Sequence, residues 1–184
     1  AACLVPGPAP RAGEPAGADL HGLSLFAAQM TDNTWEEVAL FDDVGLRDSF
    51  LAGIGLSRRL AAISDKAVVE VEGQVVRHFG TQRHWEFNAA VIGRWTWFPW
   101  NETLPTSIAW GIGPSYATRV PIEEVERSGD SQRLLVYWLA ELEVGLPDAS
   151  WTGFARLHHR SGAFGLIAGD GGSNWLTLGL RRRF

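Results

Sequence analysis

The chain has 184 residues, the size of one domain, and 46% of them are hydrophobic against 20% charged, which excludes an intrinsically disordered protein. Its formal net charge of −5 excludes a nucleic-acid partner, because no excess of Lys and Arg is available to neutralise phosphates. The sequence has no run of 18 apolar residues, which excludes a transmembrane helix. A closed β-barrel is then the only structure with which this chain would span a bilayer.

The first 20 residues differ in composition from the rest of the chain. Residues 1–19 are rich in Ala, Pro and Gly, and they lack a basic stretch followed by an apolar core. We interpret 1–20 as a flexible segment that remains after cleavage of an export signal, and 21–184 as one domain. The single cysteine, Cys3, has no partner for an internal disulfide, and whether it carries a lipid stays open.

From residue 22 onward, apolar and polar residues alternate, which is typical of β-strands with two different faces. In the segment 84–98, Val91 and Trp95 lie on an apolar face, whereas Glu86 and Arg94 lie on the opposite face. The same pattern predicts eight strands, at 22–30, 49–60, 67–78, 84–98, 106–118, 133–146, 151–161 and 174–184.

The connections between these strands alternate in length. Turn-like segments occupy 64–66, 101–105 and 147–150, whereas the connections on the other side occupy 30–48, 79–83, 119–132 and 162–173, and three of these four are long. Outer-membrane barrels have short turns at one end and long loops at the other. The charge run 123–130 is interpreted as an exposed loop.

Which face points inward separates a membrane barrel from a soluble, lipocalin-like binder. The apolar faces are almost free of charge, and aromatic residues gather at one strand end, as in an interfacial girdle: Trp95, Trp97, Phe98 and Trp100. The polar faces carry residues of both signs, namely Glu70, Glu72, Glu86, Glu141, Glu143, Arg94, Arg156, His158 and Arg181. Such charges are tolerable inside a narrow barrel only when they pair.

We therefore predict an all-β fold, an eight-stranded antiparallel transmembrane β-barrel of the outer-membrane type, with its apolar face toward lipid. The final residue, Phe184, is similar to the C-terminal aromatic residue by which bacterial outer-membrane proteins are recognised for assembly. A soluble lipocalin-like binder with an apolar interior is the alternative.

Three polar residues share the predicted lipid face at the outer end of the last two strands. By parity, His159 and Ser161 lie on the apolar face of 151–161, and Asn174 begins the same face of 174–184. One interpretation is that they are polar residues at the membrane interface. The other is a hydrolase, in which the imidazole takes the serine proton during attack on an ester and a third group orients the imidazole. This chemistry needs no cofactor, and a metal site is less natural because no carboxylate shares the face.

Residues 154–184 resemble the outer-membrane lipid A 3-O-deacylases of the PagL type, which have a His-x-Ser pair near the outer end of strand seven. Here His159-Arg160-Ser161 matches that pair, and 170–174 looks like a degenerate form of the motif that follows. The resemblance implies Ser161 as nucleophile, His159 as general base and Asn174 as the orienting residue. Gly162 stands where the family usually has Asn, and Asp170 is the available carboxylate if one is needed.

The resemblance implies a location in the bacterial outer membrane and a lipid partner, either lipid A of lipopolysaccharide or another outer-leaflet lipid. A non-catalytic barrel that serves as a structural or binding component of a surface assembly is the competing hypothesis. Whether the barrel forms a homodimer stays open.

Overall fold

The computed structural model describes residues 20–34, 37, 44–163, 165–168 and 172–184. Eight antiparallel strands form one closed barrel in which each strand pairs with its sequence neighbours and β1 also pairs with β8. The strands are β1 (His21–Thr31), β2 (Leu46–Ser64), β3 (Ala67–Gly80), β4 (Trp85–Trp95), β5 (Thr106–Ala117), β6 (Leu134–Val144), β7 (Trp151–Ser161) and β8 (Gly172–Arg183). The predicted fold class is confirmed. The predicted N-terminal segment lies almost wholly outside the described residues.

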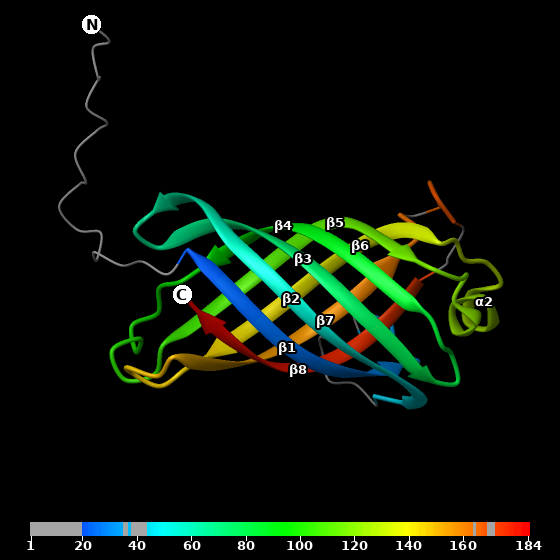
Figure 1. The fold of residues 1–184 in the computed structure, drawn as a ribbon, viewed down its shortest axis with the longest axis horizontal. Helices are drawn as coiled ribbons and strands as arrows, with labels where there is room; N and C mark the ends of the chain where they lie inside the picture. The colour runs from blue at the N-terminus through cyan, green and yellow to red at the C-terminus, as the bar shows by residue number, and fades with distance from the viewer. Residues whose placement is uncertain (1–19, 35–36, 38–43, 164, 169–171) are drawn as a thin grey trace, which may run out of the picture.

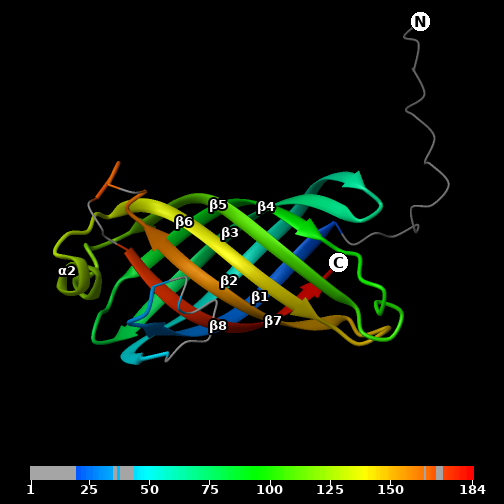
Figure 2. The same ribbon diagram turned by 180° about the vertical axis from the view of Figure 1, so that it is seen from behind.

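The two ends of the barrel differ in their connections. The turns at 65–66, 96–105 and 145–150 lie at the end where β1 begins and β8 ends, which we call the inner end. Helix α2 (Ile122–Ser128) lies at the opposite end, which we call the outer end, and the strands run obliquely between the two (Figures 1 and 2). Within the described residues, no helix is long and apolar enough to cross a membrane.

The apolar faces of the strands point outward, as the alternation predicts. Leu178 is 72% exposed and Trp110 is 54% exposed, whereas Glu72 and Arg181 are buried in the barrel interior. An apolar outer surface of this kind fits hydrocarbon and not water. The lipocalin-like alternative, which requires the apolar face inside, is therefore wrong. The aromatic side chains expected as a girdle, Trp95, Trp97 and Trp100, are exposed at the inner end.

The barrel interior contains a network of paired charges. Its members are Glu70, Glu72, Glu141, Glu143, Arg94, Arg156, Arg181 and, near the inner end, Arg183. Arg156 lies 2.8 Å from Glu72 and 2.6 Å from Glu141, and Arg94 lies 2.8 Å from Glu141. Pairing is required here, because an unpaired buried charge costs several kcal/mol.

The expected exposed loop at 123–130 is wrong in part. Residues 122–128 form α2, and Gly129 ends the helix in the left-handed conformation with φ of 78°. Glu123 and Glu124 are buried in the outer mouth of the barrel, where Glu124 accepts a hydrogen bond from Arg160 at 2.9 Å. The charged sequence of 123–130 did not predict that Glu123 and Glu124 are buried, because the partners of these carboxylates lie on distant strands.

Candidate active site

The register of β7 and β8 brings together two of the predicted site residues. His159 is paired directly with Asn174, and Ser161 is paired with Gly172. His159 Nδ1 and Asn174 Oδ1 lie 2.5 Å apart, which is a short hydrogen bond. The three residues of the predicted catalytic group therefore lie at the outer end of two adjacent strands, as the parity of the sequence indicated.

The expectation that His159 and Asn174 face lipid directly is wrong. His159 is 8% exposed and Asn174 is 1% exposed, so both side chains are covered. The Trp138 ring packs against the imidazole with 4.6 Å between ring centroids, and the connection after β1 contributes Asn33. A covered imidazole is more sharply oriented than one that projects freely into head groups.

A chain of hydrogen bonds fixes the imidazole. Asn174 Nδ2 donates to the backbone oxygen of Asn33 at 2.8 Å, which determines which end of the Asn174 amide is oxygen. Asn174 Oδ1 then accepts from His159, so the proton of the neutral imidazole is on Nδ1. This leaves Nε2 with a free lone pair, and that is the form that a general base needs.

Ser161, the last residue of β7, is half-buried. Its hydroxyl oxygen accepts a hydrogen bond from the backbone N–H of Ala163 at 3.1 Å, and in the described part of the chain no hydrogen bond joins it to His159. Residues two apart on a strand are separated by about 6.6 Å, a distance that an imidazole and a hydroxyl span when both side chains turn toward each other. Catalytic hydrogen bonds in free enzymes are often long and shorten when substrate binds.

Gly172 lets the two strand ends approach closely. Its φ is 153°, and a Cβ atom at this position would lie 2.3 Å from the backbone oxygen of Arg160. A side chain there would push β8 away from β7 and change the His159–Asn174 contact. Asp170, the carboxylate predicted as an alternative partner, lies outside the described residues.

Two contributors to this site were not found by sequence reasoning, namely Trp138 and Asn33. Trp138 is paired with His159 in the register of β6 and β7, and alternation does not give this register. Asn33 acts through its backbone oxygen, so its side-chain type carries no signal.

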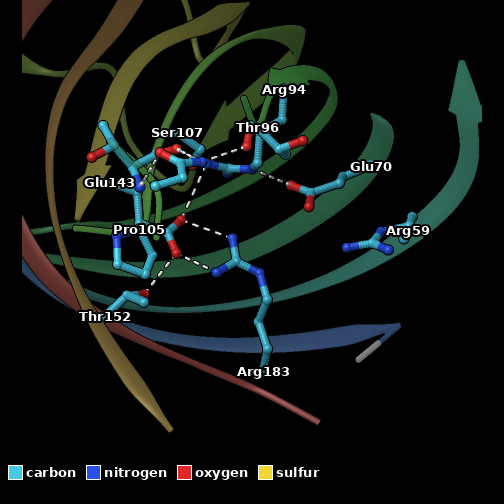
Figure 3. A pocket seen from close by; sticks show the side chains of 11 residues that line it. Arg59, Glu70, Arg94, Thr96, Pro105, Ser107, Glu143, Thr152 and Arg183 are labelled. Atoms are coloured by element: carbon cyan, nitrogen blue, oxygen red, sulfur yellow. Dashed lines mark hydrogen bonds and ion pairs between the residues drawn. The ribbon is translucent and has the colours of Figure 1, made fainter. Parts of the chain in front are cut away.

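A cavity of about 230 Å³ lies at the inner end of the barrel, at the opposite end from His159 and Asn174. Figure 3 shows Arg183 paired with Glu143, and Arg94 extending toward Glu70 and Ser107. Glu70, Arg94, Glu143 and Arg183, which line it, belong to the interior charge network, and the lining includes no imidazole. It therefore lacks the histidine base of the Ser-His scheme.

No family model matches the sequence, and no curated protein matches it. The fold is similar to two solved structures. The outer membrane enzyme PagL aligns with a TM-score of 0.59 and 15% identity over 89% of this chain and 99% of that chain. Neisserial surface protein A (NspA) aligns with a TM-score of 0.51 and 10% identity over 91% and 98% of the two chains. These likenesses show the eight-stranded barrel fold of outer-membrane proteins, and the fold is consistent with the bacterial outer membrane.

Proposed function

We propose that this barrel is an outer-membrane lipid esterase that removes an ester-linked acyl chain from lipid A or a related glycolipid. The observation that carries the proposal is the hydrogen bond of His159 to Asn174 at the outer end of β7 and β8, with Ser161 two residues further along the same face. The His159-Arg160-Ser161 sequence resembles the His-x-Ser pair of the PagL-type deacylases, and the fold similarity to PagL agrees with that resemblance.

The reaction uses the three side chains in two steps. Ser161 Oγ attacks the ester carbonyl carbon while His159 Nε2 takes the hydroxyl proton. The tetrahedral intermediate expels the sugar alkoxide, which takes that proton from His159, and the acyl chain stays on Ser161 as an ester. Water then attacks the acyl-serine and gives one proton to His159. The ester bond to Ser161 breaks, Ser161 takes that proton from His159, and the fatty acid is released. Asn174 holds the imidazole through both steps.

The outward face supplies a path for a lipid substrate. Leu157 and Leu176 are paired directly on β7 and β8, on the same face as His159 and Asn174 and one step closer to the inner end. An acyl chain that lies along these leucines in the hydrocarbon would place its ester near Ser161 at the depth of the head groups. Substrate would then enter sideways from the outer leaflet.

A non-catalytic barrel in a surface assembly is the second candidate. Two observations favour it: Gly162 offers no side-chain amide for an oxyanion, and Asn174 cannot offset a charge on the imidazole. The amide would orient His159 but would not stabilise its protonated form.

The test is acyl release from lipopolysaccharide, followed by mass spectrometry, with the barrel refolded in detergent. The unmutated chain should remove one hydroxyacyl chain, and Ser161→Ala should remove none while keeping the heat-modifiable band of a folded barrel. Ser64→Ala, at the inner end of β2, is the matched control and should behave like the unmutated chain. If the unmutated barrel releases no acyl chain where a known deacylase does, the enzymatic proposal is wrong and the non-catalytic one is preferred.

A further inference from the structure

A cluster of two histidines and a glutamate lies inside the outer end of the barrel. The β3–β4 hairpin builds it: the backbone N–H of His78 donates to the carbonyl of His84 at 3.0 Å, and Glu86 follows two residues later on β4. All three side chains are buried. One side-chain ligand atom from each, a ring nitrogen or a carboxylate oxygen, lies within 4.8 Å of the other two.

Several polar atoms of this cluster and of the adjacent turn residue Gln82 have no hydrogen-bond partner among the described residues. They are His78 Nδ1, His84 Nε2 and both polar atoms of the Gln82 side-chain amide. The His78 and His84 rings stack with 4.0 Å between centroids, so their nitrogens lie close to one another. Buried polar groups nearly always have a hydrogen-bond partner. The unpaired ring nitrogens and the unpaired amide oxygen therefore point to a ligand that accepts lone pairs.

The electrostatics of the cluster suit a cation. Histidine binds metal ions through its neutral imidazole, and the buried His84 ring lies directly against the His78 ring. His158 Nε2 holds Glu86 Oε1 at 2.8 Å, which leaves the other carboxylate oxygen facing His78 at 2.9 Å. Arg160 approaches Glu86 to 3.8 Å, but its Nη1 is paired with Glu124.

We propose that His78, His84 and Glu86 bind one divalent transition-metal ion of the Zn²⁺ class. Two imidazoles and one carboxylate form a ligand set that suits zinc, whereas Mg²⁺ and Ca²⁺ prefer oxygen ligands throughout. In a tetrahedral zinc site the ligand atoms are about 3.3 Å apart, so these three atoms, now within 4.8 Å of one another, would move closer by side-chain rotation to hold an ion. His158 acts as the outer partner that orients the ligating carboxylate.

A neighbouring cavity offers an entry route for the ion, and Gln82 offers a fourth ligand. A cavity of about 350 Å³ is lined by Gln82, His84, Arg119 and Ile122, and it lies between the β3–β4 turn and the connection that contains α2. A hydrated ion that enters this cavity meets His84 first. The unpaired Gln82 amide oxygen, or a water molecule held by it, completes the coordination.

The test uses the full chain without a polyhistidine tag, refolded in detergent and freed of metal by a chelator. Titration with Co²⁺ should give ligand-field absorption bands that saturate at one equivalent, and Zn²⁺ should displace the Co²⁺. His84→Ala should weaken binding at least tenfold. His84 lies outside the strands, so the variant should keep the heat-modifiable band. His21→Ala, at the inner end of β1, is the matched control and should bind Co²⁺ like the unmutated chain.

Thermal unfolding supplies a second measurement. Zn²⁺ should raise the unfolding temperature of the unmutated barrel and of His21→Ala, but not that of His84→Ala, because a ligand stabilises only the state that binds it. Absence of saturable binding to the unmutated barrel overturns the proposal. So does equal binding by the His84→Ala variant, or loss of binding in the His21→Ala variant.

Discussion

Replacing Glu141 by Gln should strongly destabilise the barrel, because this carboxylate is shared by three arginines. Its Oε1 lies 2.8 Å from Arg94 and 2.6 Å from Arg181, and its Oε2 lies 2.6 Å from Arg156. Glutamine has the same shape, but it keeps only one acceptor oxygen and turns an amide N–H₂ toward guanidinium donors. The network, with four glutamates and four arginines among the described residues, would then carry one unbalanced positive charge.

The magnitude follows from these contacts. A hydrogen bond to a charged group is worth about 1.5–3 kcal/mol, and removing one member of a buried ion pair costs about 3–5 kcal/mol. We expect Glu141→Gln to lower the free energy of unfolding by about 3–5 kcal/mol. Glu102→Gln, in the exposed turn after β4, changes the same atoms outside the barrel and should cost less than about 0.5 kcal/mol.

The assay is equilibrium unfolding in urea with the barrel folded in detergent micelles or vesicles, followed by tryptophan fluorescence and by the heat-modifiable band. A double variant that also carries Arg94→Gln should lose less stability than the sum of the two single variants, because the two side chains share one contact. A difference below about 1 kcal/mol between Glu141→Gln and Glu102→Gln would refute the reasoning. It would mean that water in the interior replaces the lost ion pairs.

Three further predictions concern the outer end of the barrel. Asn174→Ala should lower acyl release by roughly 10- to 100-fold with the barrel still folded, because His159 loses its orienting acceptor; unchanged release would remove Asn174 from the proposed mechanism. Gly172→Ala should lower the free energy of unfolding by about 1–3 kcal/mol in the urea assay, since its Cβ would meet the backbone oxygen of Arg160; a variant as stable as the parent would contradict this contact. Glu124→Gln weakens the contact of α2 with Arg160, so an added protease should cut 122–130 several-fold faster, as seen by mass spectrometry; equal cutting rates would show that this carboxylate does not hold the helix.

Alternation in the sequence was sufficient to predict the barrel because it assigns each side chain to a face. Trp95 and Arg94, neighbours in the chain, were placed on opposite faces, and the structure has Trp95 exposed and Arg94 buried. The same parity predicted that His159 and Asn174 share a face. The roles assigned to them stay proposals, because parity fixes a direction and says nothing about chemistry.

Alternation does not indicate how deeply a side chain is buried, which residues pair across neighbouring strands, or where the loops run. His78 and His84 meet because the pairing of β3 with β4 extends to His84, one residue before β4 begins, and alternation does not give this register. Glu123 and Glu124 belong to a segment whose charge predicts exposure. They are buried because distant strands supply their partners, for example Ser49, which donates to Glu123 at 2.8 Å. These partners come together only in the closed barrel, so the sequence alone does not identify them.

Closure also explains how one strand contributes to two separate clusters of side chains. His158 and His159 are adjacent in β7, and their side chains leave on opposite sides of the barrel wall. His158 holds Glu86 inside the barrel, and His159 contacts Asn174 on the outward side. Trp175, next to Asn174, turns inward and meets the His78 ring edge-on at 4.9 Å. A shift of β8 that moved Asn174 would therefore also move Trp175 against His78. A metal ion bound by His78, His84 and Glu86 would resist that shift, because it would hold the His78 ring against which Trp175 packs.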